Sequence, residues 1–385
     1  MEINPKSKIR NGAAIMNTLK NNNSEKSEIM RSIFCLIIVA LSIFYAHAKP
    51  ARDQNLKFFK ADDQHISYVG RIDFTDPLKP KFWSPGVYVQ AKFEGTSLEI
   101  FFNDEQPYDN YNYLEIAIDN QPPFRIKATG KSNHIMVADH LSPGAHTVII
   151  CKDTESGMCY IEFLGLKCAK LLTVKKPHHK IEFIGDSITC GSGTDLSATT
   201  CATGKWFDEH NAYMSYGPLV ARQLDAEWHL TSVSGIGLIH SCCNMNVTMP
   251  QVFDKVILRS DSLKWDFNKY TPDVVTICLG QNDGKQDSTA FCSAYVTFIN
   301  RVRTYYPKAD IVCLSSPMAN TELTIMLKKY ITGIQQYLND HGDKKVYHYF
   351  FTRSYNDGCA DHPDMAQHVL IAQQVTEYIK GLEKW

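Results

Sequence analysis

Several features that would assign this chain to a common class of binding protein are missing. The formal net charge at pH 7 is −1, so no basic excess points to a nucleic-acid partner or a membrane surface. The 12 cysteines include no Cys-x-x-Cys pair, which argues against a zinc knuckle. The apolar run 33–45 is shorter than the about 20 residues that a membrane-spanning helix needs. What remains is a globular composition, and 385 residues favour two domains.

Residues 1–48 are typical of a polar prefix followed by a secretory signal peptide. Residues 1–29 are rich in Lys, Asn and Ser and have no apolar period. Met30-Arg31, the apolar run 33–45 and the small-x-small site Ala46-His47-Ala48 then supply the basic, apolar and cleavage regions. We expect a secreted protein with no membrane partner after cleavage at Ala48. A signal anchor is the alternative, and Met30 is an alternative start.

Residues 49–172 have the pattern of an all-β domain. Val87, Val89, Ala91 and Phe93 alternate with polar residues, and Gly/Pro-rich turns such as Ser142-Pro143-Gly144 separate the runs. Short strands with no helical pattern between them predict a β-sandwich of jelly-roll type. Four aromatic residues are candidates for an exposed sugar-stacking platform or, alternatively, for ordinary packing. They are Trp83, Tyr108, Tyr111 and Tyr113.

Residues 173–180 are rich in Lys, His and Pro and predict a linker. Export would permit disulfides, and removal of Cys35 with the leader leaves 11 of the 12 cysteines. Cys151 and Cys159 flank the Thr154-Glu-Ser-Gly157 turn and are candidates to pair across a hairpin. Cys190 and Cys201 flank a loop that they would staple.

The segment 180–191, Lys-Ile-Glu-Phe-Ile-Gly-Asp-Ser-Ile-Thr-Cys-Gly, predicts a short buried strand that stops at Gly185. Ser187 then stands on the turn that enters a helix. At the carboxyl end of a strand in an α/β sheet, such a serine exposes its Oγ in the ligand-binding crevice. The spacing differs from the Gly-x-Ser-x-Gly motif of the α/β-hydrolases. An ordinary helix-capping Asp-Ser pair is the other interpretation.

From residue 181 onward, strand-like and helical runs alternate. This alternation predicts a parallel sheet that is covered on both faces and carries its site at the carboxyl ends of the strands. The expected strands are 181–184, 228–233, 273–279, 310–314 and 346–351, and the expected helices are 216–224, 290–305, 321–338 and 364–382.

Polar blocks follow these strands at what should be the same rim. They are Ser234-Gly-Ile-Gly237, Gly280-Gln-Asn-Asp283 and, before the last helix, Gly358-Cys-Ala-Asp-His-Pro363. Acyl transfer needs a nucleophile, a base and donors for the oxyanion. We therefore expect Ser187 Oγ to attack and His362 to act as general base and then acid. The N–H groups of Ser187 and Gly235 and the side-chain amide of Asn282 would hold the oxyanion.

Together these blocks resemble those of the SGNH (GDSL) hydrolases over residues 180–385. With Val69-Gly-Arg-Ile-Asp-Phe74 and Asn211-Ala-Tyr-Met-Ser-Tyr-Gly217 added, the chain from about Phe58 to Trp385 resembles carbohydrate esterase family 2. The resemblance implies an all-β jelly-roll sandwich followed by an SGNH-type α/β hydrolase domain, residues 181–385. It also implies a secreted acetylxylan esterase-like enzyme that deacetylates xylan or glucomannan without a cofactor or metal.

One position departs from the usual SGNH pattern. Cys359 stands where an Asp three residues before the catalytic His is common. Some members of the resembled family work as a Ser–His dyad in which a backbone carbonyl holds the imidazole, and we expect the same here. Asp361 and Asp357 are the alternative acids that would orient His362.

Three aromatic residues after the serine are candidates to line the acyl or sugar pocket, although packing explains each equally well: Trp206, Tyr213 and Tyr216. Two other functions stay open. One is a lipase or esterase acting on non-carbohydrate esters, which the polar segments after Ser187 and Gly235 disfavour. The other is a carbohydrate-binding protein with an inert site, which an intact set of Ser187, Asn282 and His362 disfavours.

Overall fold

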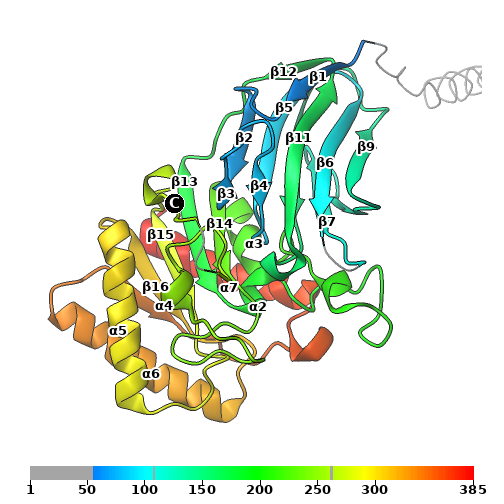
Figure 1. Ribbon diagram of the computed structural model, residues 1–385. Helices are drawn as coiled ribbons and strands as arrows, with labels where there is room; N and C mark the ends of the chain where they lie inside the picture. The colour runs from blue at the N-terminus through cyan, green and yellow to red at the C-terminus, as the bar shows by residue number, and fades with distance from the viewer. Residues whose placement is uncertain (1–54, 107–108, 261–262) are drawn as a thin grey trace, which may run out of the picture. The chain divides into compact units, whose positions relative to one another are not determined.

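Two antiparallel β-sheets precede one parallel sheet with flanking helices in the computed structural model (Figure 1). The structure describes residues 55–106, 109–260 and 263–385. The predicted leader, residues 1–48, lies outside the described residues. Within them, no helix is both long and apolar enough to cross a bilayer.

The first domain is a sandwich whose strand pairs are all antiparallel, as the period-two pattern predicted. One sheet has the order β3 (Ile72–Asp73), β4 (Lys81–Phe82), β11 (Tyr160–Cys168), β6 (Leu98–Glu105), β9 (Ser132–Ala138), with β1 (Lys57–Lys60) on β11. The other has the order β12 (Lys170–Leu172), β5 (Tyr88–Glu94), β10 (Ala145–Lys152), β7 (Tyr113–Ile118), β8 (Phe124–Lys127), with β2 (Ile66–Val69) on β5.

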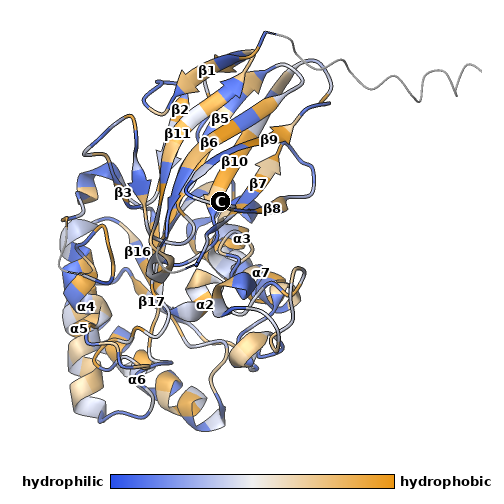
Figure 2. Ribbon diagram, turned by 45° about the vertical axis from the view of Figure 1, so that its right-hand side comes forward, coloured by the Kyte–Doolittle hydropathy of each residue, from blue (hydrophilic) through white to orange (hydrophobic). Residues whose placement is uncertain are grey.

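Alternate side chains of the sandwich strands fill its core. In β6 every second residue is buried, and Leu98, Ile100 and Phe102 point inward. Figure 2 shows hydrophobic and hydrophilic residues alternating along these strands. In β7, by contrast, all six residues are buried. Its second face is covered because Ala117 belongs to the core of the α/β domain rather than to that of the sandwich.

The second domain has a five-stranded sheet whose pairs are all parallel. Its order is β14 (Ala226–Ser232), β13 (His179–Gly185), β15 (Val274–Cys278), β16 (Asp310–Leu314), β17 (Val346–Tyr349). The α-helices are α2 (Ser187–Cys190), α3 (Tyr216–Gln223), α4 (Met249–Val252), α5 (Ser288–Tyr305), α6 (Thr321–Asp340) and α7 (Met365–Glu383). Short 3₁₀ turns span Ser156–Met158, Trp206–Glu209, Phe267–Lys269 and Cys359–Asp361.

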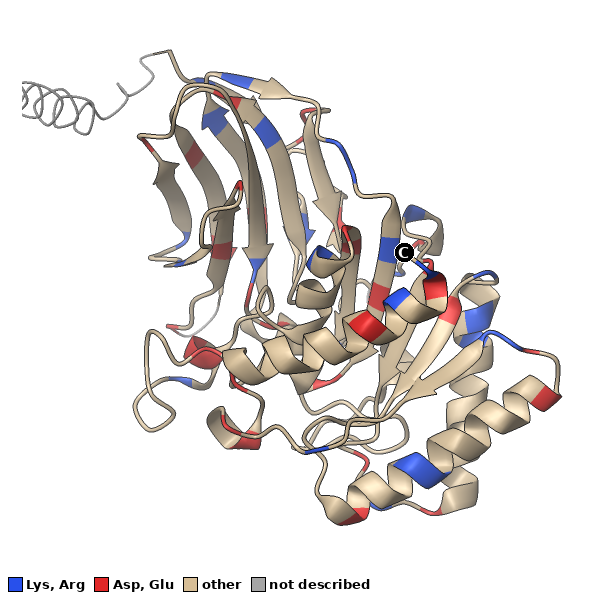
Figure 3. Ribbon diagram, turned by 180° about the vertical axis from the view of Figure 1, so that it is seen from behind, with Lys and Arg blue, Asp and Glu red and all other residues tan. Residues whose placement is uncertain are grey.

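Helices cover both faces of this sheet, as the alternating pattern predicted. Helix α3 packs against α7 and β14, whereas α5 packs against α6. Helix α7 lies on the face opposite α5, which is clear when the front view is compared with the view from behind (Figures 1 and 3). Figure 3 also shows basic and acidic residues interspersed along the visible elements.

A buried arginine joins the two domains. Arg71, between β2 and β3, is fully buried, and its Nη1 donates to the carbonyl oxygens of Phe253 and Lys255, each at 2.6 Å. Its Nη2 lies 3.4 Å from Glu182 Oε1 in β13. Burial lowers the pKa of Arg71, and the Glu182 carboxylate opposes that shift. The sandwich therefore supplies a cation that the interior of the α/β domain needs.

We expect Arg71→Met to lower the free energy of unfolding by about 3–5 kcal/mol, because it leaves Glu182 buried without its cation. Urea unfolding of the full chain measures this loss. The double variant Arg71→Met/Glu182→Gln should recover most of it, since the amide oxygen still accepts from Thr231, which now donates to Glu182 Oε1 at 2.6 Å. Equal instability of the single and double variants would contradict the pairing.

Candidate active site

The serine lies where strand β13 turns into helix α2. The strand ends at Gly185, and Asp186 caps the helix by accepting the N–H of Ile188 at 3.2 Å. A side chain at Gly185 would place its Cβ 2.1 Å from Thr189 Oγ1, so the turn requires glycine. Ser187 is the first helical residue and lines a cavity of about 500 Å³.

His362 contacts this serine directly. Ser187 Oγ lies 2.7 Å from His362 Nε2, and the opposite ring nitrogen, Nδ1, lies 3.0 Å from the carbonyl oxygens of both Cys359 and Ala360. A carbonyl oxygen only accepts, so Nδ1 carries the proton and Nε2 accepts the hydroxyl of Ser187. This tautomer is the one that removes a proton from a nucleophilic serine.

A tight turn brings the two carbonyl oxygens to the imidazole. Ala360 and Asp361 both have left-handed backbone conformations, with φ of 51° and 58°. The turn is fastened to the loop after the serine, because Cys359 N donates to Gly193 O at 2.9 Å and Cys359 forms a disulfide with Cys201. At Gly193, with φ of 69°, a Cβ would lie 2.4 Å from Cys359 O.

Neither acid that was considered as the orienting partner of His362 contacts it. The Asp357 carboxylate instead accepts from Gln367 Nε2 at 2.6 Å. Asp361 is exposed and lines a neighbouring groove, since the left-handed turn directs its side chain away from the ring. The geometry is that of the expected dyad.

Both predicted disulfides are wrong. Cys151 and Cys159 are free, because β10 and β11 belong to different sheets and do not form a hairpin. Cys190 is free and buried at the end of α2, whereas Cys201 reaches Cys359 across 158 residues of sequence. A second disulfide joins the neighbours Cys242 and Cys243 beside the cavity.

The predicted oxyanion donors also lie at the cavity. Gly235 and Asn282 line it together with Ser187 and His362. In the described part of the chain, the backbone N–H groups of Ser187 and Gly235 donate to no protein acceptor, which leaves both for a substrate oxygen.

The amide of Asn282 is already engaged. Its Nδ2 donates to Ile236 O at 2.9 Å and to Asp186 Oδ2 at 3.2 Å. Donation to an oxyanion therefore requires the longer bond to open, and this role of Asn282 stays a prediction. Burial raises the pKa of Asp186 to about 7, so its carboxyl gains a proton near neutral pH and then holds the amide less strongly.

Only one of the three candidate pocket aromatics lies at the cavity. Trp206 lines it with 46% of its surface exposed. Tyr213 and Tyr216 were wrong candidates, because both are buried in the core. The Tyr213 ring packs 3.8 Å from the Arg222 guanidinium carbon, and the Tyr216 hydroxyl lies 3.0 Å from Thr189 Oγ1.

Three of the four candidate aromatics of the sandwich take part in packing, which was the alternative to a sugar-stacking platform. Tyr111 and Tyr113 both donate to Asp208 of the α/β domain, at 2.6 and 2.8 Å, and Trp83 packs against Tyr160. Tyr108 lies outside the described residues. Tyr111 and Tyr113 therefore pack at the boundary between the domains.

Two acidic residues that sequence reasoning missed hold the turn containing Gly235. The Asp283 carboxylate accepts the N–H groups of residues 238, 239 and 240. From the sandwich, fully buried Glu155 accepts Ser234 N at 2.8 Å and the Ser234 hydroxyl. No local signal marked Glu155, which sits in a turn between two strands and is 79 residues from its partner.

Two protein-family models match this chain, one over the sandwich and one over the α/β domain. Residues 68–177 match the family model "Carbohydrate esterase 2 N-terminal", and residues 183–365 match the "GDSL-like Lipase/Acylhydrolase family". A solved family two carbohydrate esterase from Clostridium thermocellum, in complex with cellohexaose, is 33% identical with a TM-score of 0.75. The match covers 83% of this chain and 99% of that one. The chain belongs to carbohydrate esterase family 2.

Two further relatives extend the comparison. An "Acetylxylan esterase / glucomannan deacetylase" of Cellvibrio japonicus is 26% identical over 92% of this chain and 100% of its own length. "Cellulase/esterase CelE" of Acetivibrio thermocellus is 35% identical over 84% of this chain. The match spans only 40% of the length of CelE.

The backbone-held imidazole makes a prediction about the two nearby acids. Asp361→Asn and Asp357→Asn should each retain kcat for an acetyl ester within about twofold, as expected of substitutions that break no contact with the reacting groups. In a Ser–His–Asp triad, the same change at the orienting acid costs about 10⁴ in kcat. Steady-state kinetics with an acetyl ester measures kcat for both variants. A loss of about 10⁴ in kcat in either variant would contradict the dyad.

Glu155 should act as a positioning residue for the Gly235 turn. Glu155→Ala should lower kcat for an acetyl ester by about 10-fold to 100-fold, less than the about 10²–10³ lost with an oxyanion donor itself, and leave KM nearly unchanged. Glu155→Gln should recover part of kcat because it keeps one acceptor oxygen. Ser234→Ala, which keeps the bond from the backbone N–H, is the matched control and should lose less. A rise in KM with unchanged kcat would count against this role.

Proposed function

We propose that this chain is a secreted serine esterase that removes O-acetyl groups from plant polysaccharides such as xylan or glucomannan. The observation that carries the proposal is the 2.7 Å contact between Ser187 Oγ and His362 Nε2 beside two free backbone donors. The Cellvibrio relative described as an acetylxylan esterase / glucomannan deacetylase supports this substrate class. So does the cellohexaose complex of the Clostridium esterase.

The reaction follows from these positions. Ser187 Oγ attacks the acetyl carbonyl carbon while His362 Nε2 takes the hydroxyl proton. The N–H groups of Ser187 and Gly235 stabilise the resulting oxyanion. When this tetrahedral intermediate collapses, the bond between the acetyl carbon and the sugar oxygen breaks. The sugar oxygen receives the proton from His362, and the acetyl group stays on Ser187 Oγ. Water, deprotonated by His362, then attacks this ester and releases acetate.

The surroundings of the serine favour a glycan ester over a lipid ester. Trp206 offers an exposed ring at the cavity, and aromatic rings pack well against sugar faces. The groove beside the cavity is lined mainly by hydroxyl and amide side chains, which suit sugar hydroxyls rather than a long acyl chain. A protein that only binds carbohydrate would have no need of the hydrogen-bonded Ser187–His362 pair.

Secretion is the part of this proposal that rests on the leader. The signal-like segment 30–48 supports it, and so does the Cys201–Cys359 disulfide, because such bonds persist in oxidising compartments. Amino-terminal sequencing of the protein from the culture medium should give Lys49 as the first residue. A cell-bound chain that retains residues 30–48 would support the signal anchor instead.

Ser187→Ala should reduce acetate release from acetylated xylan or glucomannan by at least about 10⁴-fold, because nucleophile and base act as a unit. His362→Ala should cost about as much. Acetate release, measured enzymatically and compared with hydrolysis of long-chain esters, tests both activity and substrate class. Undiminished release from Ser187→Ala would refute the mechanism. A preference for long-chain esters would point to a lipase.

A further inference from the structure

A second cavity opens beside the catalytic one. It has a volume of about 740 Å³ and lies between α6 and the segment 351–356 that follows β17. Gln281 and Met318 line both cavities, and Asp361, next to His362, lines the second. Where the two cavities meet, the Ser316 hydroxyl donates to Gln281 Oε1 at 2.6 Å. We call this second cavity the α6 groove, and a chain bound at Ser187 can continue into it.

Two cations distinguish the α6 groove from a neutral sugar-binding site. Lys328 of α6 and Arg353 both line it. Among the described residues, the charged nitrogens of Lys328 and Arg353 lie more than 4.0 Å from every carboxylate oxygen. By contrast, Lys285 pairs at 2.7 Å with Glu322, which lies in the first turn of α6. Two unpaired cations against one carboxylate, that of Asp361, leave the lining with a net positive charge, which favours an anionic ligand.

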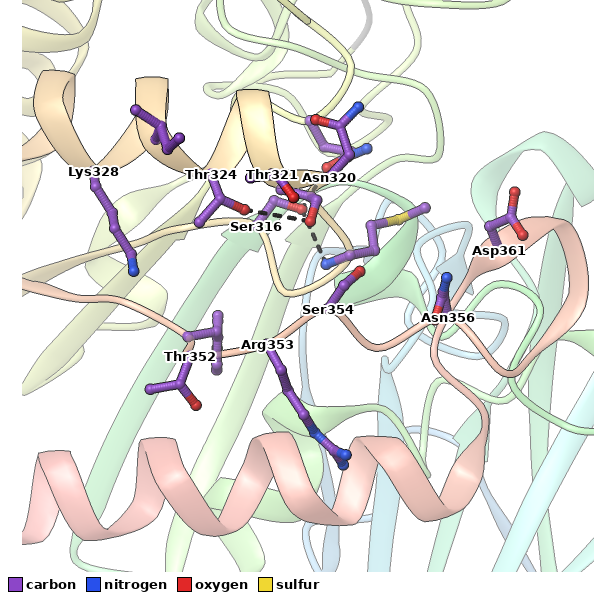
Figure 4. A pocket seen from close by; sticks show the side chains of 15 residues that line it. Ser316, Asn320, Thr321, Thr324, Lys328, Thr352, Arg353, Ser354, Asn356 and Asp361 are labelled. Atoms are coloured by element: carbon purple, nitrogen blue, oxygen red, sulfur yellow. Dashed lines mark hydrogen bonds between the residues drawn. The ribbon is translucent and has the colours of Figure 1, made fainter.

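The two cations lie on different elements that border the groove. Figure 4 shows Lys328 extending from α6 toward the segment 351–354, and Arg353 projecting from that segment toward α7. The Arg353 guanidinium carbon lies 4.5 Å from the centre of the buried Tyr355 ring, a contact that limits its freedom. In the same view Asp361, the one acidic residue of the lining, lies at the opposite side from Lys328.

We propose that the α6 groove binds a uronate-bearing stretch of the polysaccharide, so that the enzyme prefers acetylated acidic glycans to neutral ones. Lys328 and Arg353 attract the carboxylates, while hydroxyl groups such as those of Thr324 and Ser354 meet the sugar hydroxyls. Both cations line the α6 groove and neither lines the cavity that holds Ser187. Lys328 and Arg353 therefore bind a carboxylate on a sugar other than the one that loses its acetyl group. This proposal rests on the deacetylase function proposed above.

The test compares xylo-oligosaccharides of one length, chemically acetylated, with and without a single uronate branch. The double variant Lys328→Gln/Arg353→Gln should raise KM for the acidic substrate about fivefold, as two exposed ion pairs permit. KM for the neutral substrate and kcat for an aryl acetate should stay unchanged. Lys329→Gln is the matched control, because Lys329 is exposed on the same helix but does not line the groove. High salt should reduce the wild-type preference.

The outcomes separate this proposal from the function on which it rests. Equal KM changes for both substrates, or no change for either, would overturn the uronate site. If the wild-type protein releases acetate from neither oligosaccharide, the deacetylase proposal fails. Calorimetric titration of the full-length Ser187→Ala protein with the unacetylated acidic and neutral oligosaccharides then still tests whether the α6 groove binds the uronate. Tighter binding of the acidic one, lost in the double variant, supports the site, and equal binding overturns it.

Discussion

The hydrogen bonds from the His362 ring to two backbone carbonyl oxygens are the constraint on which the rest of the site depends. They fix the tautomer in which Nε2 accepts the hydroxyl of Ser187, with backbone carbonyl oxygens rather than a carboxylate as the partners of Nδ1. The carbonyl oxygens face the ring because the turn after Gly358 is left-handed and is tied to the loop after the serine by Gly193 and a disulfide. The loops that carry Ser187 and His362 are thus bonded to each other, which holds the two side chains in contact. Cys359, which stands at the position of the usual acid, supplies one of the two carbonyl oxygens and also the covalent link.

Two residues of the sandwich contact the α/β domain close to the candidate site residues. Glu155 reaches from its β10–β11 connection to the turn that presents the Gly235 N–H, and Arg71 enters the interior next to β13. Buried polar groups of this kind must be paired, so each domain leaves unsatisfied atoms in the other if it is removed. The α/β domain alone would lack the carboxylate that holds the turn containing Gly235. This dependence gives a physical reason for the two domains to occur in one chain.

Much of this arrangement was predictable because two sequence periods are strong signals. Alternation by two identified the sandwich, and alternating strands and helices placed the residues at 187, 235, 282 and 362 at one rim of a parallel sheet. Partners far apart in sequence were not predictable. The Cys201–Cys359 bond spans 158 residues, and Glu155 sits in an ordinary turn. Tyr213 and Tyr216 misled because an aromatic near a site looks the same in sequence whether it lines the pocket or the core.

An ester on Ser187 is the intermediate of the proposed acetyl transfer, and partitioning with an added alcohol is a direct test for it. With methanol present, two acetyl substrates that differ in leaving group should give one common ratio of methyl acetate to acetate, because both products arise from the same acetyl-enzyme. Ser187→Ala should give neither product above background. A ratio that changes with the leaving group, or product formation that survives in Ser187→Ala, would show that the reaction does not pass through this ester.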